Sequence, residues 1–195
     1  MTTRNPRLWF LVLMLAFVAA GAFACSGEDP KTTLQTLRDG LDAHSAGRLQ
    51  EAVEAYTTVL EQDPDNKFAL YNLGLIAQTT GSPNEAETYY RRVLEIDPDF
   101  AAALFNLAIL RNRVGSFQEA IELYRRVIAI DPVNAGAHLN LGFVLKRIGK
   151  EKEGEKEIAR ARELDPSLAP GQGSETDESP KGKTTGGRPD GNASG

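Results

Sequence analysis

Two 18-residue segments of this chain are closely similar in sequence, and they start 34 residues apart. GSPNEAETYYRRVLEIDP occupies residues 81–98, GSFQEAIELYRRVIAIDP occupies residues 115–132, and 11 of the 18 positions are identical. Looser copies occupy residues 47–64 and 149–166, again at a shift of 34. A fixed period over four consecutive copies indicates a repeat protein, in which each copy forms one structural unit that packs on its neighbours.

Each period has the pattern of two helices. Ser82 and Ser116 precede a glutamate by three residues, which is the spacing of a capping box and predicts that a helix begins after each serine. Apolar residues then recur at spacings of four and three, on one helical face, until Asp-Pro ends the helix. The other half of the period carries a second apolar stripe and closes on a glycine, such as Gly81, that is expected to be left-handed. The predicted helices are 33–46, 49–61, 67–80, 83–96, 101–114, 117–130, 135–148 and 151–164.

These repeated positions resemble the tetratricopeptide repeat (TPR), a helical hairpin of 34 residues. The resemblance covers roughly residues 33–166 and implies an all-α fold, a right-handed superhelical solenoid of antiparallel helix pairs with about four TPR units. Those units are predicted at 33–66, 67–100, 101–134 and 135–168. The small position of the TPR pattern is occupied by Gly40, Gly74, Ala108 and Gly142, and the alanine position by Ala52, Ala86, Ala120 and Gly154. The aromatic position is occupied by Tyr56, Tyr90, Tyr124 and Ile158, and the proline position by Pro64, Pro98, Pro132 and Pro166.

Two departures from the TPR pattern occur in the outer repeats. Asp39 stands where the family has leucine, and Ile158 stands where it has an aromatic residue. We expect both to weaken the outer repeats. The last predicted helix, 151–164, is far more polar than the others, which is typical of a terminal unit that turns one face to water.

The segment before the repeats has the layout of an export signal. Arg4 and Arg7 precede an uncharged apolar run over residues 8–24, with small residues just before Cys25, the chain's single cysteine. This site resembles a bacterial lipoprotein processing site, so we predict a lipoprotein-type signal peptide at 1–24, lipidation of Cys25 and a tether at 25–32. Two alternatives are open: simple secretion after cleavage, and retention of the apolar run, near the lower length limit for a membrane span, as an anchor.

The composition of the remaining chain limits its partners. Residues 169–195 are rich in Gly, Pro and Ser and are predicted to be disordered, because they cannot bury enough apolar surface to offset the entropy of ordering. The formal charge is -5, and loss of the two arginines in the signal peptide makes it -7. A nucleic-acid partner usually requires a basic face, so none is predicted.

Catalytic motifs are lacking. The two histidines, His44 and His138, are far apart and have no second ligand at a metal-binding spacing. No P-loop, dinucleotide fingerprint or nucleophile motif occurs. We therefore predict that the protein is not an enzyme and uses neither a metal nor a cofactor.

A binding surface is what the resemblance implies instead. In TPR proteins the first helix of each pair lines a concave groove, with positions 2, 5, 6, 9, 12 and 13 of the repeat facing the ligand. Position 6 is asparagine in three successive repeats, which predicts either a ladder that binds a peptide backbone or hydrogen bonds to a neighbouring helix. The predicted groove residues are Tyr71, Asn72, Leu75, Phe105, Asn106, Ile109, Arg113, Leu139, Asn140, Phe143 and Arg147.

Together these features predict a lipid-anchored scaffold or adaptor of the cell envelope, facing the periplasm from the outer membrane. It would bind a peptide segment of another envelope protein in the groove and assist assembly of an envelope complex. The alternative is a soluble or membrane-anchored periplasmic assembly chaperone with transient clients. The sequence predicts no oligomeric state.

Overall fold

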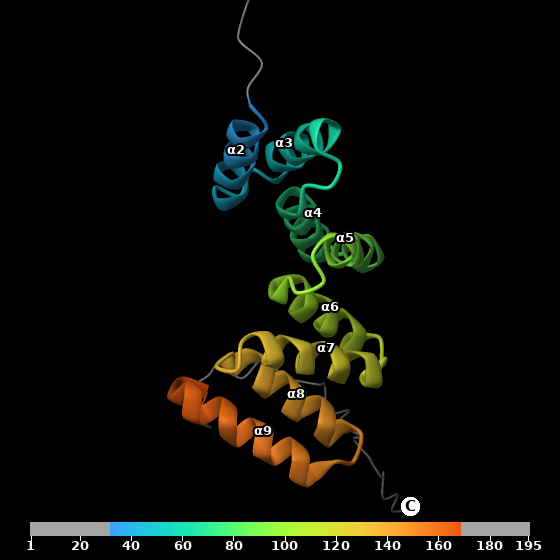
Figure 1. Ribbon diagram of the computed structural model, residues 1–195, viewed down its shortest axis with the longest axis vertical. Helices are drawn as coiled ribbons and strands as arrows, with labels where there is room; N and C mark the ends of the chain where they lie inside the picture. The colour runs from blue at the N-terminus through green and yellow to red at the C-terminus, as the bar shows by residue number, and fades with distance from the viewer. Residues whose placement is uncertain (1–31, 169–195) are drawn as a thin grey trace, which may run out of the picture. The chain divides into compact units, whose positions relative to one another are not determined.

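The computed structural model describes residues 32–168, which form α-helices and one short 3-10 helix, with no β-strand in that range (Figure 1). The predicted signal peptide, Cys25, most of the tether and the C-terminal tail lie outside the described residues. Every α-helix in this range begins and ends within one residue of its predicted bounds, and the all-α class is confirmed. The helices are α2 (Thr33–Ser45), α3 (Leu49–Gln62), α4 (Lys67–Thr79), α5 (Pro83–Ile96), α6 (Ala101–Arg113), α7 (Phe117–Ile130), α8 (Ala135–Arg147), α9 (Glu151–Leu164) and η1 (Pro166–Leu168).

The helices divide between two compact units, with the boundary after Ile96. Unit 1 contains α2 to α5, and unit 2 contains α6 to η1. In each unit consecutive helices pack as hairpins, and the second helix of one hairpin packs on the first helix of the next. Within residues 32–168, no helix is long and apolar enough to cross a membrane.

The turn inside each hairpin depends on a left-handed glycine, as predicted. Gly81 has φ of +86°, a conformation that residues with a Cβ rarely adopt. The amide of Ser82, the next residue, donates to the carbonyl of Ala77 at 2.8 Å. This hydrogen bond satisfies a carbonyl that the end of α4 leaves free and turns the chain into α5.

The turns that lead into α4 and α8 have an Asp-Pro-x-Asn sequence. In unit 2 the carboxylate of Asp131 accepts from the amide of Val133 at 3.3 Å, and the side chain of Asn134 accepts from the amide of Ala137 at 2.9 Å. Asn66 caps α4 in the same way, accepting from Ala69 at 3.1 Å. In α4 and α8 an asparagine oxygen therefore satisfies a free backbone amide, whereas α6, with Phe100 at this position, has no side-chain cap.

The predicted capping box at Ser116 is wrong. Ser116 does precede α7, but its hydroxyl makes no capping hydrogen bond. Its ψ of 61° lies outside the extended region from which a side chain normally reaches back to the first turn. For Ser82, the capping box stays a prediction.

The core of each of the first three hairpins is a large aromatic ring against a small residue. Tyr56, Tyr90 and Tyr124, on the second helices of the first three repeats, are fully buried. A Cβ atom added at Gly74 would lie 2.6 Å from Cε1 of Tyr90, far inside van der Waals contact. The small residue on the first helix is thus required by the ring that packs over it.

The fourth repeat replaces the aromatic ring with closer helices. Ile158 is smaller than tyrosine, and both Gly142 on α8 and Gly154 on α9 lack side chains. A Cβ atom at Gly154 would lie 2.6 Å from the carbonyl oxygen of Gly142, so the two backbones are in direct contact. The departure at Ile158 is therefore matched by a second small residue, and close packing is retained.

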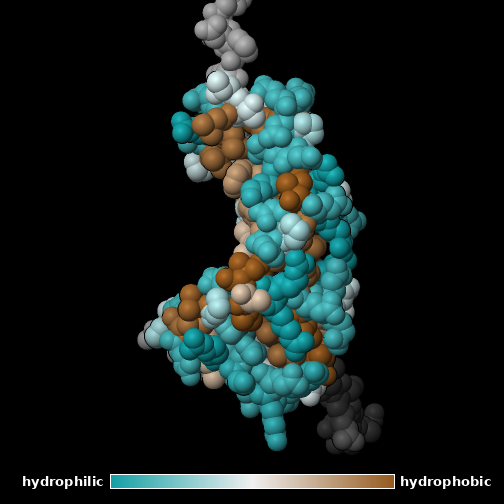
Figure 2. Space-filling model, viewed as in Figure 1, coloured by the Kyte–Doolittle hydropathy of each residue, from teal (hydrophilic) through white to brown (hydrophobic). Residues whose placement is uncertain are grey.

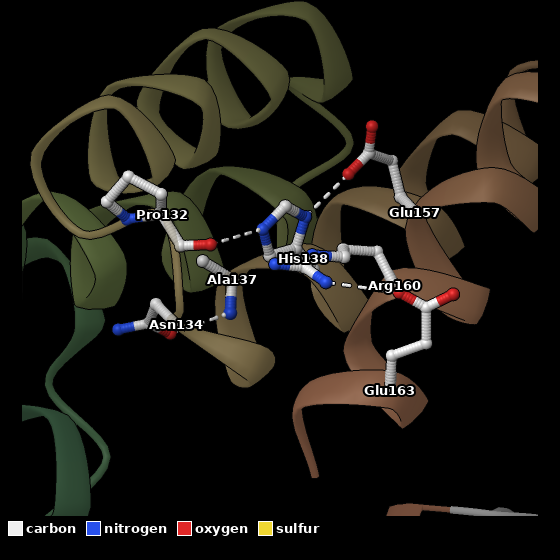
Figure 3. A network of polar contacts seen from close by, with 7 residues as sticks. All are labelled: Pro132, Asn134, Ala137, His138, Glu157, Arg160 and Glu163. Atoms are coloured by element: carbon white, nitrogen blue, oxygen red, sulfur yellow. Dashed lines mark hydrogen bonds and ion pairs between the residues drawn. The ribbon is translucent and has the colours of Figure 1, made fainter.

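A polar network also joins α8 and α9 (Figure 3). The ring of His138, which is 7% exposed, places Nδ1 2.6 Å from the carboxylate of Glu157 and Nε2 3.2 Å from the carbonyl of Pro132. One turn further along α9, Arg160 donates to Glu163 at 3.1 Å. His138 thus connects α9 to the turn that precedes α8.

Candidate protein-binding face

Exposed apolar side chains are concentrated on the first helices of the hairpins. In each unit we call the surface formed by repeat positions 2, 5, 6, 9, 12 and 13 of the first helices the first-helix face; these helices are α2 and α4 in unit 1, and α6 and α8 in unit 2. Seven large hydrophobic residues are exposed in the described part of the chain, and four of them lie at positions 2 or 9 of this face. Figure 2 shows such hydrophobic surface over α2. The four residues are Leu34 (58% exposed), Leu41 (43%), Phe68 (49%) and Phe143 (53%).

In unit 1 the predicted groove residues of α4 are divided between core and surface. The ring of Tyr71 lies 6.0 Å from that of Tyr90, centroid to centroid, so it packs partly into the hairpin. Leu75 is half-buried, and Asn72 is nearly buried. The half-buried rings and aliphatic chains leave one edge for a ligand.

In unit 2 one contact shows that α6 and α8 present adjoining faces. Phe105, at position 5 of α6, packs against Tyr124 with 5.8 Å between ring centroids. Its other edge faces Gly136, at position 2 of α8, where an added Cβ atom would lie 3.5 Å from Cζ of Phe105. Ile109 and Leu139 are half-buried on the same two helices.

The two arginines at position 13 are both exposed. The guanidinium of Arg147 lies 5.5 Å from the ring centroid of Phe117, within range of a cation–π contact with the first turn of α7. Arg113 ends α6. These cations leave the C-terminal ends of α6 and α8 basic, which suits an acidic group on a ligand.

The asparagines at position 6 differ in what the structure shows. The amide nitrogen of Asn72 donates to the carbonyl of Phe68 at 2.8 Å, within its own helix. This bond is neither of the two arrangements expected from the sequence, and it uses one of the donors that a peptide would need. Asn106 and Asn140 are half-buried, and their peptide-binding role stays a prediction.

Position 2 of the face contains two residues that were missed from the sequence. Leu34 and Phe68 are among the most exposed apolar residues of unit 1. The signal was present, because position 2 belongs to the implied groove and both residues are large and apolar.

The described residues contain no group of three or more His, Cys, Asp and Glu side chains that could hold a metal ion. The two histidines have structural contacts instead. The ring of His44 packs edge-on against Tyr56, with 6.5 Å between centroids, and His138 contacts Glu157.

Comparison with known proteins identifies the family of this chain. Models of the tetratricopeptide repeat match residues 37–99, 71–135 and 113–171, which together are well over half of the chain. The chain belongs to the tetratricopeptide repeat family. TPR domains bind protein partners and are generally not enzymes, so this TPR protein is a protein-interaction module.

Solved structures of TPR proteins named MamA share the fold. A crystal structure of MamA is 27% identical, with a TM-score of 0.63 over 69% of this chain and 74% of that one. A MamA RS-1 double mutant is 21% identical, with a TM-score of 0.64 over 84% and 89%. MamA MSR-1 is 19% identical, with a TM-score of 0.59 over 83% and 98%, so these last two show the fold alone. No curated protein matches the chain in sequence.

Proposed function

We propose that this TPR protein is a lipid-anchored adaptor of the cell envelope that holds a peptide segment of another envelope protein on its first-helix face. The observation that carries the proposal is the concentration of exposed apolar residues at positions 2 and 9 of the first helices. Single exposed apolar residues are normal on a protein surface, but their recurrence at the same repeat positions is typical of an interaction site. Holding the partner in this way would assist assembly of an envelope complex.

The chemistry of the face suits an extended peptide with apolar side chains. The half-buried ring of Phe105 and the exposed ring of Phe143 offer apolar contacts, and burial of large apolar side chains is the main source of affinity at such surfaces. Asn106 and Asn140 offer both a donor and an acceptor to a peptide backbone. The exposed Arg113 and Arg147 favour an acidic residue in the peptide.

The face is tested with peptides selected from a random displayed library on the full chain. Phe68→Ser removes a large apolar contact from the face of unit 1, and Phe143→Ser removes one from the face of unit 2. Each is expected to weaken the peptides that bind its own unit about tenfold or more. Val133→Ser is the matched control, because Val133 is 65% exposed but lies at position 33, off the face. Equal losses from all three variants, or no loss from the phenylalanine variants, would contradict the proposal.

The anchor is supported by the sequence around Cys25. Two or more acyl chains on one cysteine give stable membrane attachment, since each buried methylene contributes about 0.8 kcal/mol. Metabolic labelling with a fatty acid should label the natural protein and leave Cys25→Ser unlabelled. An unlabelled natural protein would exclude the lipid anchor and favour the alternative, a soluble or membrane-anchored periplasmic assembly chaperone with transient clients.

A further inference from the structure

Unit 1 contains a pocket of about 250 Å³ between α3, α4 and α5. None of its lining residues belongs to the first-helix face. Its volume is below the roughly 300 Å³ at which small-molecule sites begin, so it is sized for a single long side chain. The walls are Leu49 and Val53 of α3 with Leu73, Ile76 and Ala77 of α4, and the polar lining residues are Gln50, Thr80, Glu85 and Tyr89.

Glu85 differs from the glutamates at the same place in the other repeats. Position 19 is glutamate in all four repeats, and three of these have a basic partner. Glu119 lies 3.7 Å from Arg111, and Glu51 and Glu153 pair with Arg48 and Lys150. Within residues 32–168 no basic side chain pairs with Glu85, whose side-chain contact is the hydroxyl of Tyr89 at 3.5 Å. The pocket therefore has an unpaired carboxylate in its lining.

The third repeat shows which side chain can pair with the glutamate at position 19. Arg111, at position 11 of its repeat, extends to the glutamate at position 19, and its side chain is 17% exposed. In the second repeat the same two positions are Ala77 and Glu85, and both line the pocket. The pocket thus has an alanine and an unpaired carboxylate where the third repeat has an arginine and its ion-pair partner.

We propose that the pocket receives an arginine side chain of a protein partner, in the manner in which Arg111 approaches Glu119. The apolar walls would cover the aliphatic stem, while the guanidinium stays near water and bonds to Glu85 and to the hydroxyl of Tyr89. The formal charge of -5 also favours a cationic partner. This site is independent of the first-helix face and of Cys25.

The test uses the isotope-labelled full chain and N-acetyl-L-arginine amide as the probe, followed by NMR. The probe should cause saturable shifts of the backbone signals of Ala77, Thr80 and Glu85. N-acetyl-L-citrulline amide, which has nearly the same shape but no charge, should bind more weakly. Equal binding of the two probes, or no saturable shift at these residues, would overturn the proposal.

Variants separate the carboxylate from the cavity. Glu85→Gln should weaken the arginine probe about two- to fivefold, the range for an ion pair near water. Glu51→Gln is the control, since Glu51 is paired with Arg48 and does not line the pocket. An unchanged affinity in Glu85→Gln, or an equal loss in both variants, would exclude the proposed ion pair.

Variants that fill the cavity provide a second test of the proposal. Ala77→Arg supplies the chain's own arginine and should abolish binding of the probe. If this variant fails to fold, Ala77→Leu fills the same position as Leu145 does in the fourth repeat and should also abolish binding. Phe68→Ser, which tests the first-helix face, should leave the probe's affinity unchanged, so the two proposals can fail separately. Probe binding that survives in a folded Ala77 variant would place the site elsewhere.

Discussion

At the scale of single residues, the buried tyrosines differ in whether their hydroxyls have a partner. The hydroxyl of Tyr90 donates to the side-chain oxygen of Gln78 at 3.0 Å. Tyr124 occupies the same position one repeat later, where Asn112 replaces the glutamine. The hydroxyl of Tyr124 and the side-chain oxygen of Asn112 are both buried without a hydrogen-bond partner among the described residues. A side chain one methylene shorter thus leaves two polar atoms unpaired, which is costly in an apolar core.

Restoring the missing methylene should therefore stabilise unit 2. Asn112→Gln is expected to raise the free energy of unfolding by about 1 kcal/mol, the usual net contribution of one hydrogen bond, as measured by urea denaturation. The reverse change, Gln78→Asn, should cost a similar amount. A gain that persists in a Tyr124→Phe background would show that the hydroxyl is not the partner.

At the scale of one helix, α8 contains two glycines in opposite environments. A Cβ atom at Gly142 would lie 2.6 Å from Cγ1 of Ile158 and 2.8 Å from the carbonyl oxygen of Gly154. A Cβ atom at Gly136 would meet nothing closer than 3.5 Å. The same residue type is therefore required by packing at one site, while at the other it only weakens the helix.

This contrast predicts opposite effects of one substitution within one helix. Gly142→Ala should lower the free energy of unfolding by about 1 to 3 kcal/mol, because the backbone of α9 cannot move aside cheaply. Gly136→Ala should raise it by up to about 1 kcal/mol through higher helix propensity. Thermal melts of both variants measure this difference, and a stable Gly142→Ala protein would contradict the close contact of α8 and α9.

At the scale of the whole molecule, a buried tyrosine recurs in three repeats, and so does its effect on the pH dependence of stability. Burial raises the pKa of Tyr56 to about 12, and burial likewise raises the pKa values of Tyr90 and Tyr124. These three are among the five tyrosines of the chain. In the folded protein each phenol stays neutral at a pH at which the unfolded chain already ionises.

The stability should therefore fall steeply in alkali. The contribution of each buried phenol is fully present below the unfolded pKa of about 10 and is lost as the pH rises through the folded value. Urea denaturation between pH 9 and pH 12 should show a falling midpoint, with a shallower fall in Tyr56→Phe. Ionisation of all five tyrosines near pH 10 with unchanged helical circular dichroism would contradict this burial.

The period, the bounds of the helices and the left-handed glycines were predictable from the sequence alone. These features depend on contacts within one repeat, and the same residue pattern recurs in several repeats. Gly81, for example, needed only its place after a helical stripe, because a positive φ excludes most other residues there. The candidate face was predictable only in part. Helical periodicity places positions 5 and 9 on one side of each first helix, but the exposed Leu34 and Phe68 at position 2 were not among the predicted residues.

The tertiary structure alone decided which polar groups find partners and where space remains. Ser116 has the right spacing for a cap but the wrong backbone angle, and Asn72 bonds within its own helix. The pocket at Glu85 is lined by Ala77 at the repeat position where the third repeat has Arg111. The cap and the amide bond depend on local backbone angles and the pocket depends on side chains of three helices, and residue spacing alone specifies neither.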